Sequence, residues 1–225
     1  MIPTFAVVPT KNRPAVVRGL LKSLVGQVDH FVVVDNNDVV DDYGDVHPNV
    51  YPDWITTIHC PGYPPNLSAL YNVGMNAVAA HVGEFVPEWN LVLLNDDVLC
   101  PPGWVKSLSD AMRASPAVMA FTDRLGRGEP FLYTQPPTTP YETCMVAACM
   151  LRGEAGMRFD EDFKWWYGDT DLDYRCRQAG GVLAVPGKIP DHLHPSAQTV
   201  ADAILTAQTH RDRETFARKW NGVPW

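Results

Sequence analysis

The sequence predicts an α/β fold in which a mostly parallel central sheet is flanked by helices. Four short apolar runs are typical of buried strands: FAVV at 5–8, FVVV at 31–34, LVLL at 91–94 and VMAF at 118–121. Segments with helical spacing lie between these runs, and this alternation favours βαβ units. The runs are continuously apolar, which is typical of parallel strands that are covered on both faces.

Three helices are predicted from apolar residues that recur three and four positions apart. The first begins at Pro14, which suits a first helical turn, and ends before Gly26. The positions that predict the helices are Val17, Leu20, Leu21 and Leu24, then Leu67, Leu70, Tyr71, Gly74 and Val78, then Trp104, Val105, Leu108, Ala111 and Met112. Two proline-rich stretches, 60–66 and 126–141, are predicted loops. The second is long enough to be a mobile lid or a substrate-contacting loop.

Composition and charge favour one globular domain over residues 1–225. The chain is 46% hydrophobic and 20% charged, which is ordinary for a protein with one substantial core. Its formal charge of -8 would repel a phosphate polymer, so nucleic acid is a disfavoured partner.

The cysteines and the apolar segments indicate a reducing, aqueous compartment. The five cysteines are odd in number and show no CxxC spacing, so we expect reduced thiols. The amino-terminal segment lacks a basic stretch and contains Pro3 and Pro9, which argues against a signal peptide. No apolar run approaches the roughly 20 residues of a membrane helix, so we expect a soluble, cytoplasmic protein.

Polar clusters directly follow three of the predicted strands: TKNR at 10–13, DNN at 35–37 and NDD at 95–97. Ligands of open α/β sheets bind at the carboxyl ends of the strands, so we expect the clusters to form one rim. Any one of them alone also fits an ordinary polar loop.

The last cluster places two carboxylates at the end of an apolar strand. Neighbouring carboxylates repel one another and resist burial, so water, a base or a cation must compensate them. Mg²⁺ and Mn²⁺ prefer oxygen ligands and often complete their coordination with phosphates and water. A turn in which the Asn and Asp side chains bond their own backbone is the alternative for an isolated NDD.

Six segments, in order along the chain, together carry a family resemblance. PTKNRP is similar to T-x-N-R-P, and VVVDNND to a strand that ends in a nucleotide-contacting Asp. NLSALYNVGMNAV is similar to N-x-G…R-N-x-G, with Tyr71 in place of the usual basic residue. LLNDDVLCPPGWV is similar to the DxD-type segment L-L-N-x-D-x-x-x-P-P-G-W, FDEDFKWWYGDTDLDYRCRQAGG to F-D-E-x-F…Y-x-E-D-x-D-L-x-x-R…G-G, and FARKWNG to a common carboxyl-terminal ending. The chain thus resembles glycosyltransferase family 2, inverting enzymes of the GT-A fold.

The resemblance implies a single GT-A catalytic domain that moves a sugar from a nucleotide-diphosphate sugar, with UDP-sugars favoured, to a hydroxyl acceptor such as a glycan or a protein. Residues 1–97 would form the nucleotide-binding half, 98–196 the acceptor and catalytic half, and 197–225 a carboxyl-terminal helix. The implied nucleotide-sugar contacts are Thr10, Arg13, Asp35, Asn36, Asn66, Asn72 and Asp96.

A divalent cation, Mn²⁺ or Mg²⁺, is implied by the alignment of Asp97 with the family's metal-binding aspartate. His192 or His194 in IPDHLHPSAQT is a candidate second ligand, because neutral imidazole is a common metal ligand. The family's H-x-x-x-S spacing fits His192 better, and an ordinary loop histidine is the alternative for each.

Asp169 is implied as the general base, which takes the proton of the acceptor hydroxyl during an inverting transfer. The segment DTDLDYRCRQAGG also fits a plain helix with acids in its first turn and a glycine stop. In that helix Asp171 with Arg175, and Asp173 with Arg177, are spaced for surface ion pairs. Asp169 and Asp173 share a face, so the pKa of at least one is expected to rise.

Gly168 stands where the family usually has Glu. Either a nearby acid such as Asp171 substitutes, or acceptor recognition differs. Trp166, Tyr167 and Asp171 are the candidate acceptor contacts, although an aromatic cluster also fits a core.

Two rival functions stay open at this point. A sugar nucleotidyltransferase would need a glycine-rich loop after the first strand, and PTKNRP contains no glycine. A non-catalytic nucleotide-sugar-binding module would account for the departure at Gly168.

Overall fold

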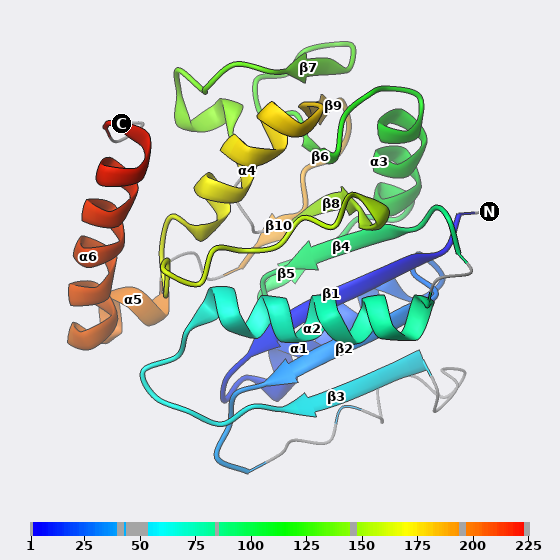
Figure 1. Ribbon diagram of the computed structural model, residues 1–225. Coiled ribbons are helices and arrows are strands. Elements are labelled where there is room, and N and C mark those ends of the chain that lie inside the picture. Colours follow the sequence, from blue (N-terminus) through cyan, green and yellow to red (C-terminus); the bar gives the residue numbers. More distant parts are fainter. Residues whose placement is uncertain are drawn as a thin grey trace.

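An eight-stranded mixed sheet forms the centre of the protein and carries helices on both faces (Figure 1). The computed structural model describes residues 2–39, 43, 54–83, 86–144, 148–193 and 197–222. Across the sheet the strands lie in the order β3-β2-β1-β4-β8-β6-β9-β7. Their bounds are β1 Thr4–Thr10, β2 His30–Asp35, β3 Ile55–His59, β4 Asn90–Leu94, β6 Met119–Thr122, β7 Phe131–Tyr133, β8 Ala148–Arg152 and β9 Val182–Val185.

The first four strands of this order form a parallel sheet, as the continuous apolar runs predicted. β1 pairs in parallel with β2 and β4, and β2 pairs in parallel with β3. Beyond β4 the sheet is mixed, because β8 is antiparallel to both β4 and β6 while β6 and β9 are parallel. The pairing of β4 with β8 joins residues of the two predicted halves in one sheet.

The three predicted helices are confirmed, the segment DTDLDYRCRQAGG contributes a fourth, and the predicted carboxyl-terminal helix is divided into two. The helices are α1 Pro14–Leu24, α2 Leu67–Val82, α3 Trp104–Arg113, α4 Gly168–Ala179, α5 Ala197–Ala201 and α6 Ala203–Trp220, with 3-10 turns η2 Pro140–Glu142 and η3 Gly153–Ala155. α1 begins at Pro14, whose fixed φ suits a first turn. Asn66 is the N-cap of α2, and its side-chain oxygen accepts the backbone N–H of Ala69 at 3.1 Å.

Alternate residues of the parallel strands point to opposite faces of the sheet, so each face packs against its own helices. Phe5 and Val7 of β1 pack in the same core cluster as α2, which supplies Tyr71 and Met75. Ala6 and Val8 pack on the other face with Val92 and Leu94 of β4 and with the apolar stripes of α1 and α3. Both layers are buried, which accounts for the continuous apolar runs within β1, β2 and β4.

The segment 126–141, a predicted loop, is not loop throughout. It contains β7, which pairs antiparallel with β9 at the outer edge of the sheet, and none of its residues lines the cavity described below. The Phe131 and Tyr133 rings pack edge to face with their centroids 4.8 Å apart, and the Arg127 guanidinium lies over the Phe131 ring. The prolines of this segment predict a loop, but a short strand forms within it because that strand pairs with β9, which is distant in sequence.

A small ribbon carries the second half of the chain back to the end of β4. β5 (Val98–Leu99) pairs antiparallel with β10 (Asp191–His192), with His192 opposite Val98. The backbone N–H of Leu193 also donates to the Asp97 carbonyl at 2.9 Å. This pairing brings His192 beside the acidic cluster, although the two lie far apart in sequence.

The cysteines and the helices agree with two further expectations. All five cysteines are unpaired thiols, and four of them are buried. Within the described ranges, no helix combines the length and the apolar character needed to cross a membrane.

Candidate active site

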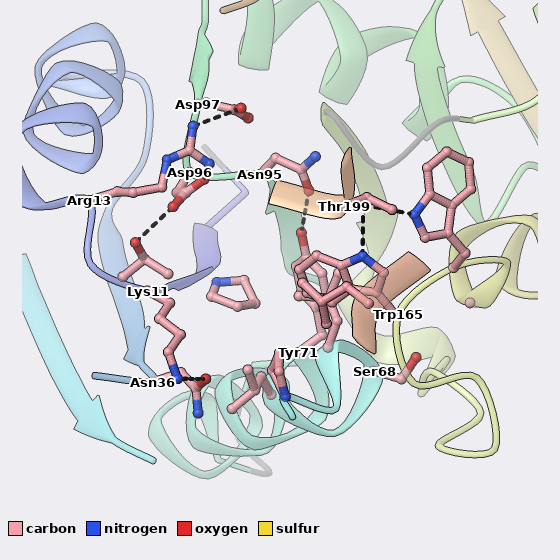
Figure 2. Close-up of a pocket in the computed structure, with 18 of the residues that line it drawn as sticks. Lys11, Arg13, Asn36, Ser68, Tyr71, Asn95, Asp96, Asp97, Trp165 and Thr199 are labelled. Atoms are coloured by element: carbon pink, nitrogen blue, oxygen red, sulfur yellow. Dashed lines mark hydrogen bonds and ion pairs between the residues drawn. The ribbon is translucent and has the colours of Figure 1, made fainter. Parts of the chain in front are cut away.

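A cavity of about 700 Å³ opens at the carboxyl ends of β1 and β4 (Figure 2). One side is formed by the loop after β1 and the turn after β4, and the floor by the segment 65–71 that leads into α2. Residues 165–169 before and at the start of α4 form another side, and α5 with the start of α6 completes the lining. This volume lies in the range of ligand sites in proteins, about 300–1,000 Å³.

Arg13 bridges the two carboxylates at the end of β4. Its Nη1 lies 2.8 Å from Asp96 Oδ1, and its Nη2 lies 2.9 Å from Asp97 Oδ2. The hydroxyl of Thr10 donates to the other oxygen of Asp96 at 2.8 Å. A guanidinium fork supplies two charge-assisted hydrogen bonds, so it compensates much of the repulsion between the neighbouring acids. We call these four residues the acidic cluster.

The two carboxyl groups of this cluster differ in their affinity for protons. Burial raises the pKa of Asp96 to about 6, against the lowering effects of Arg13 and Thr10. Burial would also raise the pKa of Asp97, but hydrogen bonds from His192 and Arg13 lower it to about 2. Asp97 therefore stays ionised at neutral pH, as a metal ligand must.

His192 completes this side of the cavity. Its Nε2 lies 3.1 Å from Asp97 Oδ1, so an imidazole and an ionised carboxylate face one another. Among the residues that the structure describes, no group of three His, Cys, Asp or Glu side chains is placed to hold a metal ion. His194, the other candidate, lies outside the described residues. A cation held by Asp97 and His192 would thus depend on ligand oxygens and water for its other positions.

Four of the predicted contacts lie outside the cavity lining and have structural partners. Asp35 is fully buried and accepts the backbone N–H of Asn37 at 2.9 Å. Asn66 caps α2, as described above. Asn72 donates to the Phe159 carbonyl at 3.0 Å and accepts the N–H of the same residue at 2.9 Å. The fourth, Asp171, is described with α4.

Asn36, which follows Asp35, does line the cavity. Its amide donates to the Cys60 carbonyl at 2.6 Å, and its oxygen lies 3.4 Å from Lys11 Nζ. The predicted rim therefore exists, with Thr10, Arg13, Asn36 and Asp96 among its residues.

Asp169 lines the cavity from the first turn of α4. One of its oxygens accepts the backbone N–H of Thr170 at 2.7 Å. Asp169 and the acidic cluster are more than seventy residues apart in sequence, and the fold places them around the same cavity. The cavity thus contains a carboxylate, Asp169, that can accept a proton, and it contains two further carboxylates whose charge Arg13 balances. A group transfer with acid–base catalysis needs such a proton acceptor.

The two ion pairs of α4 are formed but are not surface pairs. Arg175 Nε lies 2.8 Å from Asp171 Oδ2, and Arg177 Nε lies 2.5 Å from Asp173 Oδ1. Both aspartates are fully buried, because Asp171 faces α6 and Asp173 faces the segment at Cys144. Burial is the main cause that raises the pKa of Asp173, and the charge of Asp169 adds to it.

Close packing accounts for the glycine that precedes Asp169. A Cβ at Gly168 would lie 2.6 Å from the Ser68 hydroxyl and 3.4 Å from a carbon of the Phe159 ring. A larger residue there requires the Ser68 side chain to shift. Asp171 does not take its place in the cavity, because its oxygens bind Arg175 and Trp220.

The aromatic residues before Gly168 line the cavity, and one of them also packs in the core. Trp165, Trp166 and Tyr167 all line the cavity, and Trp166 is 40% exposed. Tyr167 also packs against Phe216 of α6, with ring centroids 5.3 Å apart. A cavity position and a core contact are therefore combined in Tyr167.

Several lining residues were not predicted. Tyr71 stands at the position where the family usually has a basic residue. Its hydroxyl donates to the Leu94 carbonyl at 2.9 Å and so holds the turn after β4. Tyr63 donates to Asp202 at 2.7 Å, and Lys11 lies 5.4 Å from the centre of its ring. Thr199 and Asp202 come from α5 and the start of α6, which contain no motif that marks them.

Comparison with solved structures identifies the fold. S. aureus TarS 1-349 superposes with a TM-score of 0.63 at 14% identity, over 94% of this chain and 69% of that one. Glucosyl-3-phosphoglycerate synthase from Mycobacterium tuberculosis, in complex with phosphoglyceric acid, gives 0.61 at 12% identity over 99% of this chain and 81% of that one. The chain spans 42% of the longer S. aureus TarS structure. At these identities the likeness shows a common fold.

The sequence comparison identifies the family, whereas the structural comparison identifies the fold. No curated protein matches the chain significantly in sequence. The family model described as glycosyl transferase family 2 matches residues 5–177, which include β1 from Phe5 on, the acidic cluster and α4 up to Arg177. The chain therefore belongs to glycosyl transferase family 2 and is a glycosyltransferase.

Proposed function

We propose that the chain transfers a sugar from a nucleotide-diphosphate sugar to an acceptor hydroxyl, with inversion at the anomeric carbon and with help from a divalent cation. The observation that carries the proposal is that the acidic cluster and Asp169 line one cavity at the carboxyl ends of parallel strands. This is the usual place for a ligand in an open α/β sheet.

The nucleotide sugar is assigned to the side of the cavity formed by the loop after β1. Thr10, Arg13, Asn36 and Asp96 line this side, and Arg13 and Lys11 supply positive charge for the diphosphate. Asp35, Asn66 and Asn72 act from behind it, because each binds backbone groups that hold the surrounding loops in place. A UDP-sugar is the favoured donor, since structures of S. aureus TarS 1-349 contain UDP and UDP-GlcNAc.

Asp97 and His192 are the residues that would hold the cation. They fit such a role because carboxylate oxygens and imidazole nitrogens are common ligands of divalent cations, and the two groups lie 3.1 Å apart at the cavity. Bound there, a cation would stabilise the negative charge that develops on the departing diphosphate. Arg13, which already bridges both aspartates, would share that task.

Asp169 is assigned as the general base. The acceptor oxygen forms a bond to the anomeric carbon while the bond from that carbon to the diphosphate oxygen breaks on the opposite side. The diphosphate leaves with the bonding electron pair, and the acceptor proton passes to the Asp169 carboxylate. Such proton transfer contributes about 10²–10⁴-fold to a rate. The acceptor therefore approaches from the side of α4 and α5.

A donor panel tests the assignment. Thermal unfolding is measured with UDP-, GDP- and dTDP-sugars, each without a divalent cation, with Mn²⁺ and with Mg²⁺. A ligand that binds the folded state alone raises Tm, and at 100 times its Kd it stabilises by about 2.7 kcal/mol. We expect a UDP-sugar with Mn²⁺ to give the largest shift. If no nucleotide sugar raises Tm with either cation, the donor assignment is wrong.

Slow hydrolysis of the donor separates an enzyme from a binding module. Wild-type protein is expected to release UDP from the donor that binds best, and Asp169→Asn to bind the donor without releasing UDP. Binding without hydrolysis or transfer in the wild type would favour the non-catalytic module instead.

A further inference from the structure

Two tryptophans at the cavity are held together by one hydroxyl. Trp165 Nε1 donates to Thr199 Oγ1 at 2.8 Å, and Trp166 Nε1 donates to the same oxygen at 3.2 Å (Figure 2). The two residues are neighbours in sequence, and Thr199 belongs to α5, more than thirty residues further on. The only polar atom of each indole ring is thus occupied by protein. We call Trp165 and Trp166 the tryptophan pair.

The backbone of the pair is held by a buried carboxylate of α6. Asp212 Oδ2 accepts the N–H groups of Trp165 and Trp166 at 2.7 and 2.8 Å, and Oδ1 accepts that of Lys164 at 3.2 Å. Gln208 of the same helix donates to Oδ1 at 2.7 Å. Asp212 is fully buried, so these bonds replace its hydration.

α6 is itself joined to the catalytic helix α4. Phe216 is fully buried among Phe163, Tyr167 and Tyr174, with the Tyr174 ring edge-on at 5.3 Å. Trp220 Nε1 donates to Asp171 at 3.0 Å, and Lys219 Nζ lies 2.7 Å from the same oxygen. Asp171, two residues after the proposed base, therefore fixes α6 against α4 and does not face the cavity.

This arrangement leaves apolar ring surface at the cavity beside the base. Trp166 is 40% exposed, and it precedes Asp169 by three residues. A pyranose ring has hydroxyls on its edge and C–H groups on its faces, so an aromatic face complements it. Rings that are already held in place lose little freedom when they bind such a ligand.

The charges around the pair disfavour an anionic acceptor. Among the described residues that line the cavity, the lysine and arginine side chains are Lys11 and Arg13, both from the loop after β1. The side near the tryptophan pair carries Asp169 and Asp202 instead. These carboxylates would repel a phosphorylated acceptor and can accept hydrogen bonds from sugar hydroxyls.

We propose that the acceptor is an uncharged carbohydrate whose ring stacks on the tryptophan pair, and that Thr199 and Asp212 are positioning residues for that stack. The inference rests on the proposed function, because it assigns the second substrate of the same cavity. It gives α5 and α6, which lie beyond the residues matched by the family model, a role in choosing the acceptor.

Binding of simple sugars tests the proposal. Methyl glycosides of glucose, galactose and N-acetylglucosamine, and the disaccharide cellobiose, are titrated into the protein saturated with UDP and Mn²⁺. Saturation-transfer NMR and tryptophan fluorescence report binding, and 3-phosphoglyceric acid serves as the anionic probe. We expect at least one neutral sugar to bind and the anionic probe not to bind.

Variants then locate the bound sugar. Trp166→Ala removes a ring, and Thr199→Val removes the shared acceptor oxygen while it keeps the side-chain shape. Each is expected to weaken the sugar about tenfold, the size of one lost aromatic contact, and to leave the UDP affinity unchanged. Thr199→Ser keeps the hydroxyl that accepts both indole N–H groups, so this variant should bind the sugar as the wild type does. Thr209→Val is the matched control, because that hydroxyl bonds only the Leu205 carbonyl of its own helix among the contacts described.

Three outcomes would overturn the inference while the UDP result stands. The first is that no neutral sugar binds, the second that 3-phosphoglyceric acid binds in their place, and the third that Trp166→Ala and Thr199→Val bind sugar as the wild type does. Failure of UDP itself to bind would instead contradict the proposed function. The two failures are therefore distinguishable.

Discussion

The two sides of the cavity are built in different ways. The acidic cluster comes from short loops at the ends of β1 and β4, and its side chains bind one another directly at 2.8–2.9 Å. The side of the tryptophan pair depends on contacts between residues 164–166 and α5 or α6, which are separated by 33 to 48 positions. One side is fixed by neighbouring parallel strands, whereas the other is fixed by a helix that follows the sheet. The first side suits a substrate part common to many enzymes of this fold, and the second suits a part that varies.

The largest effect is expected where the two sides meet, at Asp169. Asp169→Asn removes the proton acceptor and keeps the size of the side chain. We expect transfer and donor hydrolysis to fall by about 10²–10⁴-fold, the usual contribution of a general base. UDP affinity, measured by calorimetry, should stay unchanged. Activity within a few-fold of the wild type would show that another group accepts the proton.

A smaller effect is expected from Asp97→Ala on the nucleotide side. Removal of a metal ligand should weaken UDP in the presence of Mn²⁺ by at least about 10–100-fold, the loss found for outer-shell partners of metal ligands. Without Mn²⁺ the loss should be much smaller, so the measurement is the UDP affinity of each protein with and without the cation. The control is Asp110→Asn, which makes the same charge change at a side chain that is 64% exposed on α3. Equal losses with and without Mn²⁺ would argue against a cation at Asp97.

On the side of the tryptophan pair, Asp212→Asn tests whether that side can be weakened without an effect on the nucleotide side. An amide offers one acceptor oxygen where the carboxylate accepts four N–H groups, and loss of a hydrogen bond to a buried charge costs about 1.5–3 kcal/mol. We expect Tm to fall by about 3–12 °C for a chain of this size. UDP with Mn²⁺ should still stabilise the variant by the same increment as the wild type. Loss of that increment would mean that the two sides are not independent.

The same difference explains how much of the site could be predicted. The acidic cluster was recognisable because a strand that ends in Asn95, Asp96 and Asp97 is a local pattern, and parallel strand ends converge. Asp35, Asn66 and Asn72 carry equally recognisable motifs, yet their side chains bind backbone groups. A motif therefore predicts which loop lies near the cavity, but it does not predict which side chain of that loop lines the cavity.

The fold could be predicted where it depends on local patterns, and less well elsewhere. α1, α2 and α3 follow from apolar spacing alone. β7 and β8 did not, because short strands in the second half gain their stability from pairing with β9 and β4, which are distant in sequence. Thr199 and Asp212 were missed for the same reason, since a threonine and an aspartate on helices are ordinary surface residues until a distant loop meets them.

The smallest effect concerns Gly168, which lies between the two sides. Gly168→Ala adds one methyl group against the Ser68 hydroxyl at 2.6 Å, and overpacking of this kind costs about 1–3 kcal/mol. Ser68→Ala removes the oxygen that obstructs it, so the double variant should recover part of the loss in denaturant unfolding. Gly128→Ala is the control, because nothing lies within 4 Å of a Cβ there. If Gly168→Ala proves as stable as Gly128→Ala, close packing against Ser68 does not account for the departure from the family's glutamate.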